Sequence, residues 1–199
     1  MAQESFSRYQ LRYLKCVHCG LYFSSVPADQ LDTYLNYAET FSSEWRGEGR
    51  KEVFTEVLSQ VKGEPCGKLL DVGCGGGLML VLAKDHGWNV YGVEPGMGED
   101  AWAFEDVRMR ISHTIAEAGG EAEFDAVTAV NVIDQVAEPW VLLRQSAQKL
   151  KADGMLVIRI PNFTVQFILH KLAVLLPKKL GSRLLSSVVM HEFGLGRKA

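Results

Sequence analysis

The sequence predicts an α/β protein with a doubly wound, mainly parallel sheet and helices on both faces. Two observations support this prediction. From residue 68 onward, short apolar runs of strand length alternate with helical stretches, which is typical of βαβ units. The first apolar run, residues 69–72, continues into a glycine turn and then an expected helix over residues 78–85. Because ligands in such sheets bind at the carboxyl ends of the strands, the turn is a candidate binding site.

Four further strands are expected, each from its own pattern. Residues 89–94 form the next apolar run, and residues 107–111 alternate apolar and charged side chains, as a half-buried strand does. Residues 124–130 and 155–160 are mostly apolar, and Pro161 ends the last run.

Two helices are expected to cover this sheet. One spans residues 139–151, with Gly154 in the turn that follows. The other spans residues 50–62 and should pack beside the sheet, because its apolar residues fall on one stripe. The residues of this stripe are Val53, Phe54, Val57, Leu58 and Val61.

The glycine turn places Asp71 at the end of the first strand and Gly73, Gly75 and Gly77 in the turn itself. Glycine allows the backbone to approach a ligand closely, and the following helix directs its positive N-terminal end at the same place. A dinucleotide-binding turn would have its third glycine at position 78, where Leu78 stands. A phosphate-binding loop would need Gly-Lys-Ser/Thr, which is absent from this segment.

Glu94 ends the second strand about 20 residues after the glycine turn. In doubly wound folds an acid at this spacing binds the two hydroxyl groups of a ribose, with charge-assisted hydrogen bonds. The alternative is a solvated glutamate at the end of a strand. The spacing, together with Pro95 and Gly96 after the strand, favours the ribose role.

These segments resemble the class I S-adenosylmethionine-dependent methyltransferases. Residues 71–77 match their motif I, Asp/Glu-x-Gly-x-Gly-x-Gly, and Phe124-Asp125 is similar to the start of their fourth strand. Leu150-Lys-x-x-Gly154 and the trailing Pro161-Asn162 resemble the flanks of their fifth strand. The resemblance covers residues 66–162 and implies a Rossmann-like fold with S-adenosylmethionine as cofactor. It implies that the cofactor is bound by Asp71, Gly73, Gly75, Gly77 and Glu94.

By position, the resemblance adds three loop residues to this site. Thr114 and Ile115 follow the third strand and would line the adenine pocket, although an ordinary strand-to-helix loop would look the same. Asn131 ends the fourth strand and would face the methionine end of the cofactor. The segment that begins there, Asn-Val-Ile-Asp-Gln-Val, departs from the Glu-Val-Leu-Glu-His-Val of some quinone-type O-methyltransferases. Gln135 replaces the histidine and cannot transfer a proton near neutral pH, so no catalytic base is assigned.

The N-terminal region, residues 1–49, contains a Cys-x-x-Cys pair formed by Cys16 and Cys19, which resembles one knuckle of a zinc ribbon. A structural zinc site needs four ligands, and the sequence has no second Cys-x-x-Cys. We therefore expect no zinc within this chain alone. Cys16 and Cys19 are weak metal candidates, and His18 as a third ligand would still leave the site one ligand short. Residues 27–37 predict a short aromatic helix.

The C-terminal region, residues 163–199, is apolar at first and has six Lys and Arg residues against one acid. A cap or core helix is the favoured interpretation, and contact with a membrane surface through residues 163–183 is the alternative. The family normally ends with two further strands, but no strand pattern follows Phe193. We therefore expect a truncated chain or a sheet without its last two strands, in which a second copy (a homodimer) would cover the open edge.

Together these patterns predict three regions: an N-terminal hairpin and cap helix (1–49), a cofactor-binding core (50–162) and a C-terminal cap segment (163–199).

The 199 residues are 47% hydrophobic and 23% charged, as in globular proteins, and the net charge of −3 gives no general attraction to nucleic acid. The N-terminus has no signal-peptide pattern, and four cysteines without one indicate the cytoplasm. The predicted function is methyl transfer to a small-molecule acceptor. The alternatives are a degenerate or truncated cofactor-binding module without turnover and an RNA-modifying methyltransferase.

Overall fold

The computed structural model describes residues 2–8, 11–18, 20, 22–24, 48–61, 67–96, 104–136, 138–160, 168, 172, 175 and 193–194. The chain separates into two compact units, each of which is described by itself. One consists of Leu35–Ile133 and Glu138–Arg159, and the other of Met1–Tyr34, Asp134–Ala137 and Ile160–Ala199.

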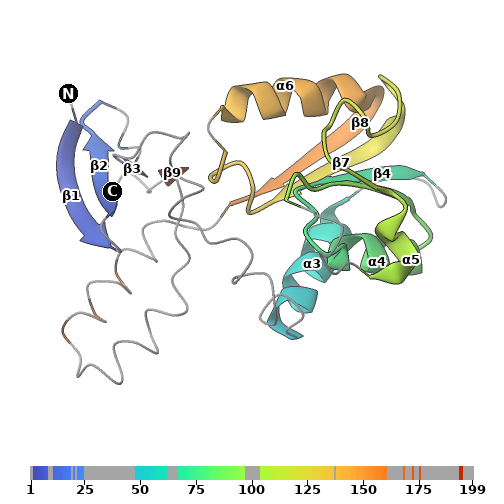
Figure 1. The fold of residues 1–199 in the computed structure, drawn as a ribbon, viewed down its shortest axis with the longest axis horizontal. Helices are drawn as coiled ribbons and strands as arrows, with labels where there is room; N and C mark the ends of the chain where they lie inside the picture. Colours follow the sequence, from blue (N-terminus) through green and yellow to red (C-terminus); the bar gives the residue numbers. More distant parts are fainter. Residues whose placement is uncertain are drawn as a thin grey trace. The chain divides into compact units, whose positions relative to one another are not determined.

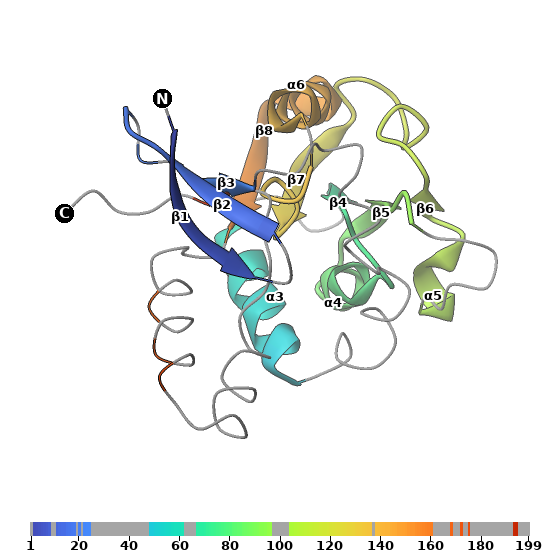
Figure 2. The ribbon, with the colours of Figure 1, turned by 60° about the vertical axis from the view of Figure 1, so that its left-hand side comes forward.

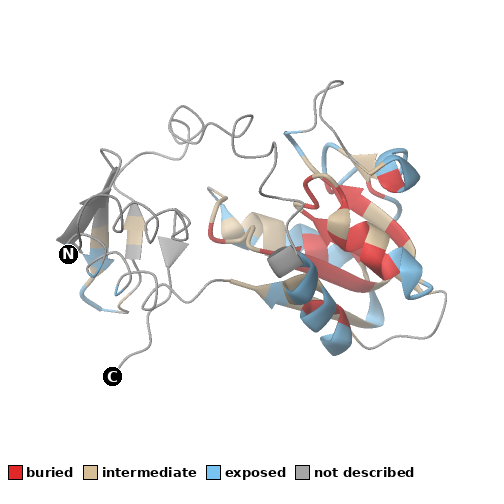
Figure 3. Cartoon of the chain, turned by 90° about the horizontal axis from the view of Figure 1, so that it is seen from below, coloured by how far each residue is buried: buried red, intermediate tan, exposed pale blue. Residues whose placement is uncertain are grey.

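The first unit contains a five-stranded parallel sheet with the strand order β6-β5-β4-β7-β8. Figure 1 labels β4, β7 and β8 of this sheet, and Figure 2 labels all of its strands. Its strands are β4 (Lys68–Val72), β5 (Asn89–Val93), β6 (Ile111–Ser112), β7 (Phe124–Val130) and β8 (Leu150–Arg159). The central strands β4 and β7 are almost entirely buried (Figure 3), as expected for a parallel sheet covered on both faces. The sequence prediction of a mainly parallel sheet is confirmed, and the two further strands typical of the family are not among the described residues.

Helices cover both faces of this sheet (Figure 2). On one face lie α3 (Glu48–Gln60), α4 (Leu78–Asp85) and α5 (Glu105–Arg108), and on the other lies α6 (Pro139–Lys149). The apolar stripe predicted for α3 is confirmed, since Val57 and Leu58 are buried and Phe54 packs against the same core. Burial of such stripes against the sheet is the main stabilising contribution in this unit.

The strand expected over residues 107–111 is wrong. Most of this segment lies in the single turn of α5 and the residues after it, and only Ile111–Ser112 pairs with β5. The alternation would place Met109 inside, yet its side chain is 94% exposed. The carbonyl of Phe104 accepts hydrogen bonds from the N–H groups of Val107 and Arg108, so the backbone is paired locally instead of in a sheet.

The junction between α6 and β8 also differs from the expectation. The helix ends at Lys149 rather than at residue 151, and β8 begins at once. Phe124 pairs with Leu150 but Ala126 pairs with Met155, so residues 151–154 form a bulge. Gly154 therefore lies within this bulge, where a Cβ atom would be 3.0 Å from the carbonyl oxygen of Phe124.

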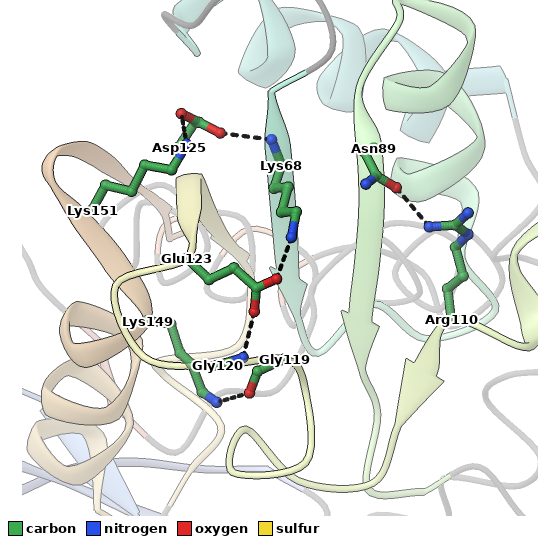
Figure 4. A network of polar contacts seen from close by, with 9 residues as sticks. All are labelled: Lys68, Asn89, Arg110, Gly119, Gly120, Glu123, Asp125, Lys149 and Lys151. Atoms are coloured by element: carbon green, nitrogen blue, oxygen red, sulfur yellow. Dashed lines mark hydrogen bonds and ion pairs between the residues drawn. The ribbon is translucent and has the colours of Figure 1, made fainter.

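The amino-terminal edge of the parallel sheet is held by a network of charged residues (Figure 4). Asp125 accepts hydrogen bonds from the backbone N–H of Lys68 at 2.7 Å and from Nζ of Lys151 at 2.6 Å. Glu123 pairs with Nζ of Lys68 and accepts from the N–H of Gly120. The hydrogen bond to Glu123 raises the pKa of Lys68, and the same contact lowers the pKa of Glu123. The network thus links β4, β7 and β8 at the amino ends of these strands, opposite the carboxyl ends where the glycine turn lies.

The second unit contains an antiparallel sheet with the order β1-β2-β3-β9. Its strands are β1 (Ala2–Arg8), β2 (Leu11–Cys16), β3 (Tyr22–Ser24) and β9 (Phe193–Gly194). The pairing of β9 with β3 was not predicted, because two residues are too few to give a strand pattern. Among the helices of the described residues, none has the length and apolar character needed to cross a membrane.

Cys16, the first of the two candidate zinc ligands, is the last residue of β2 and precedes a turn. The N–H of Gly20 donates to the carbonyl of Cys16 at 2.9 Å, and Gly20 has a φ of +76°, a conformation that favours glycine. Cys19 lies outside the described residues, as does the aromatic helix expected over residues 27–37. Within the part of the chain that the structure describes, no group of three or more His, Cys, Asp or Glu residues is arranged to hold a metal ion.

Candidate functional site

The glycine turn leaves the carboxyl end of β4 and leads into α4. Gly73, Gly75 and Gly77 have φ values of +73°, +52° and +86°, in the left-handed region that non-glycine residues rarely adopt. The N–H groups of Gly73 and Cys74 donate to the carbonyl of Val93 at 2.7 and 3.0 Å, which fixes the turn against β5. Gly77 is the N-cap of α4 and provides no side chain to cap the helix. The first N–H groups of α4, which have no partner within the helix, therefore lie next to the turn.

Two of these glycines are also required by the packing of the protein itself. A Cβ atom on Gly73 would lie 2.3 Å from Cγ2 of Val132, and one on Gly77 would lie 2.7 Å from Cγ2 of Val107. The sequence analysis interpreted all the glycines as room for a ligand. For Gly73 and Gly77 the structure gives a second reason, so the binding hypothesis depends more strongly on the acids around the turn.

Glu94 directly follows β5, and its carboxylate lies against the glycine turn. Oε2 accepts from the N–H of Gly75 at 2.9 Å, and Oε1 accepts from the N–H of Gly96 at 3.0 Å. Its own N–H donates to the carbonyl of Ser112 in β6 at 2.9 Å. A carboxylate has about four lone-pair sites, so both oxygens can still accept from a diol.

Asp71 lies within β4 and is buried, with 3% of its surface exposed. Its Oδ1 accepts from Oγ1 of Thr128 in β7 at 2.6 Å. The pKa of Asp71 is raised to about 7, because burial and the charge of Glu94 raise it by more than the hydrogen bond from Thr128 lowers it. Burial, followed by the charges of Asp71 and Glu94, also raises the pKa of the neighbouring Cys74 thiol, which therefore stays neutral.

Thr114 and Ile115 lie in the loop after β6, as predicted. Glu117 accepts from the N–H groups of His113 and Thr114 at 3.1 Å each, and its own N–H donates to Oγ1 of Thr114 at 3.4 Å. The loop is thus ordered by a reciprocal capping arrangement. Ile115 is buried and packs in the same apolar cluster as Val93. Adenine contacts by Thr114 and Ile115 stay a prediction.

Asn131 follows β7 at the same edge of the sheet. Its φ is +57°, its N–H donates to the carbonyl of Arg159 at 2.8 Å, and its Oδ1 accepts from Nη1 of Arg159 at 2.5 Å.

The structure therefore brings together the ends of β4, β5, β6 and β7, with every predicted cofactor residue at or near this edge. It adds three residues that sequence reasoning missed: Thr128, Val132 and Arg159. Thr128 and Arg159 each gave a signal, as a polar or charged residue in an otherwise apolar run.

A parallel sheet of this order, with a glycine turn after its central strand and an acid after the neighbouring strand, is a Rossmann-like fold with a nucleoside-binding edge. Comparison with known proteins gives the family. Residues 45–185 match the profile of a family described as a methyltransferase domain, and the chain belongs to this family.

Two curated relatives and one solved structure illustrate the similarity. The chain is 30% identical over 108 residues to the ubiquinone biosynthesis O-methyltransferase of Azorhizobium caulinodans, covering 50% of this chain and 42% of that protein. It is 37% identical over 95 residues to the enzyme of the same name from Ruegeria pomeroyi, covering 44% and 38%. The chain thus spans less than half of the length of these relatives. The PH0226 protein of Pyrococcus horikoshii has a similar fold, with a TM-score of 0.50, 25% identity and coverage of 66% of this chain and 64% of that one.

The residues of the site fit S-adenosylmethionine, the cofactor of this family. The cofactor contains a ribose diol, for which Glu94 is placed at the turn with acceptor capacity remaining. It also contains two positively charged groups, the sulfonium and the ammonium. Asp71 and Glu94 supply negative charge at this end of the sheet, and burial of a carboxyl such as Asp71 is costly in the absence of a cation. No phosphate-binding lysine is required, which agrees with the composition of the turn.

Proposed function

We propose that residues 50–162 bind S-adenosylmethionine and that the chain transfers its methyl group to a small-molecule acceptor. The observation that supports this most strongly is the Glu94 carboxylate, held against the turn by the N–H groups of Gly75 and Gly96. In this proposal Glu94 binds the ribose hydroxyl groups, and the backbone of the glycine turn packs against the cofactor. Thr114 and Ile115 border the adenine, and Asn131 borders the methionine end.

The bound cofactor supplies a methyl group that is already activated by the positive charge on sulfur. The chain's own residues then have to bind and orient the reactants, and orientation alone provides a large part of such an acceleration. After β7 this chain has Gln135 where some relatives have a histidine, so this segment offers no proton shuttle near neutral pH. The proposal therefore favours an acceptor whose nucleophile needs little help from a base.

The curated relatives support a small molecule as the acceptor class, because their names place them in ubiquinone biosynthesis. A net charge of −3 does not favour a nucleic acid. An RNA substrate and a cofactor-binding module without turnover are thus the competing functions.

A transfer assay separates these functions. The purified chain is incubated with S-adenosylmethionine labelled with tritium on the methyl group, together with a panel of small amines, thiols, phenols and catechols and, separately, with transfer RNA. We expect label in a small organic product and none in RNA. A Glu94→Ala variant should lose this transfer, and Glu56→Ala on the exposed surface of α3 should retain it. Label in RNA would contradict the acceptor class, and tight cofactor binding without any transfer would favour the degenerate module.

Three finer proposals concern partners and location. Membrane-surface contact through residues 163–183 is supported by Ile168, Leu172 and Leu175, which are helical, spaced as one helix face, and 51%, 50% and 81% exposed. Sedimentation with vesicles of anionic phospholipid tests this contact, and light scattering tests the proposed homodimer. The cytoplasm is proposed from the cysteine usage alone.

A further inference from the structure

A threonine in β7 contacts the buried acid of the glycine turn. Asp71 and Thr128 are register partners in the parallel pair formed by β4 and β7. Thr128 is fully buried and Asp71 is 3% exposed. Oγ1 of Thr128 lies 2.6 Å from Oδ1 of Asp71 and 3.5 Å from the carbonyl oxygen of Leu70. Because a hydroxyl has one hydrogen to donate, the short contact identifies the carboxylate of Asp71 as its acceptor.

We propose that Thr128 is a positioning residue of the cofactor site, whose hydroxyl orients the carboxyl of Asp71 next to the glycine turn and favours its ionised form. Since Asp71 serves the cofactor only if the proposed function holds, this inference rests on that function. Thr128 itself is fully buried within β7 and need not touch the cofactor. It acts through Asp71.

The electrostatics of Asp71 show why such a donor matters. Its pKa is raised to about 7, chiefly by burial and further by the charge of Glu94, and both of these disfavour the carboxylate. The hydrogen bond from Thr128 is the contribution that lowers the pKa. Among the described residues, the Cys74 thiol also interacts with Asp71, but it is neutral and carries no charge that would stabilise the carboxylate. Without the hydroxyl, a larger share of the carboxyl would be protonated at pH 7 and it would offer a cationic ligand less charge.

Packing alone does not account for a threonine at this position. The neighbours of Thr128 along β7 are Val127 and Ala129, both fully buried and apolar. Valine has nearly the shape of threonine, so it would fill the same space and would suit a buried strand. The hydroxyl therefore contributes a hydrogen bond where the strand would otherwise be apolar throughout residues 126–130.

The inference is tested by the pH dependence of ligand binding. S-adenosylhomocysteine is titrated calorimetrically into the wild type, Thr128→Val, Thr128→Ser and Asp71→Asn between pH 6 and pH 9. A lost charge-assisted hydrogen bond shifts a pKa by about one unit, so the midpoint of the Thr128→Val profile should move up by about one pH unit. Its affinity should then be about five-fold weaker at pH 7 and nearly equal to that of the wild type at pH 9. Thr128→Ser keeps the hydroxyl and should follow the wild type.

The controls separate this inference from the proposed function. Thr55→Val removes a hydroxyl from the exposed face of α3 and should leave the profile unchanged. If Thr128→Val weakens binding equally at every pH, or not at all, Thr128 has a structural role only and the inference is overturned. If Asp71→Asn binds as tightly as the wild type, the role proposed for Asp71 fails instead. Should Thr128→Val not fold, Thr128→Ala removes the same hydroxyl and provides the same comparison.

Discussion

Replacing Asp71 by Asn should make the ligand-free protein more stable at high pH. The folded-state pKa of Asp71 is about 7, above its ordinary value of 3.8, because the carboxyl is buried. Between these two pH values the folded state therefore binds this proton more tightly than the unfolded state. It follows that stability contributed by this group is fully present below pH 4 and is lost as the pH rises toward 7. Asparagine does not titrate, so the variant escapes this loss.

The size of the effect follows from the two pKa values. Each pKa unit corresponds to about 1.4 kcal/mol, so ionisation of Asp71 costs the folded state about 4 kcal/mol at pH 8. About 1.5 kcal/mol of this cost is already present at pH 5. The difference in unfolding free energy between Asp71→Asn and the wild type should therefore change by about 2.5 kcal/mol, in favour of the variant, from pH 5 to pH 8.

Urea denaturation at the two pH values measures this change. With a slope of about 2 kcal/mol per molar, the difference between the two unfolding midpoints should change by about 1 M urea. Asp85→Asn replaces an exposed aspartate at the end of α4 and should change in parallel with the wild type. If Asp71→Asn also runs parallel to the wild type, the carboxyl is not buried as described. The explanation of its role in cation binding would then be wrong.

Two other predictions concern the turn and the opposite edge of the sheet. Gly73→Ala should destabilise the protein by about 2–4 kcal/mol in thermal unfolding, because it combines a left-handed φ with overlap against Val132. Gly87 also has a left-handed φ, +90°, but a Cβ atom added there would have no atom within 4 Å. Gly87→Ala should therefore cost only the backbone strain of about 1–2 kcal/mol. If the two variants lose equal stability, the overlap with Val132 does not contribute. At the amino ends of the strands, the contact with Lys68 lowers the pKa of Glu123 in the folded protein. The stability that Glu123 contributes is therefore present above the pKa of the unfolded state and is lost as the pH falls through the pKa of the folded state. Glu123→Gln should therefore lose less stability than the wild type between pH 5 and pH 3 while binding S-adenosylhomocysteine equally well, and an altered affinity would show that the network reaches the site.

The sequence predicted the central elements of the fold because their patterns are local. β7 and α4 have the predicted bounds, since continuous apolar runs and a glycine turn leave few alternatives. The strand over residues 107–111 failed because five residues of alternation are also compatible with one helical turn. The fully exposed Met109 and the buried Val107 distinguish the two only in three dimensions.

The site could be predicted only in part, for a similar reason. Asp71 and Glu94 follow strands, so their meeting at one edge follows from the topology of a parallel sheet. The pairing of Asp71 with Thr128 depends on the register between β4 and β7, which no local pattern fixes. The contact of Val132 with Gly73 likewise depends on how the loop after β7 folds back over the turn. Contacts between segments that are far apart in the sequence account for all three residues that were missed.

The central claim is that the glycine turn and Glu94 form the cofactor site, and a nuclear magnetic resonance titration tests it most directly. S-adenosylhomocysteine is added to the ¹⁵N-labelled chain while the backbone amide signals are followed. We predict that the amides of Gly73, Gly75 and Gly77 shift together with that of Glu94, while Gly120 and Glu123 at the opposite edge stay in place. Shifts confined to other parts of the chain, or no shifts at millimolar ligand, would contradict the assignment of this edge as the cofactor site.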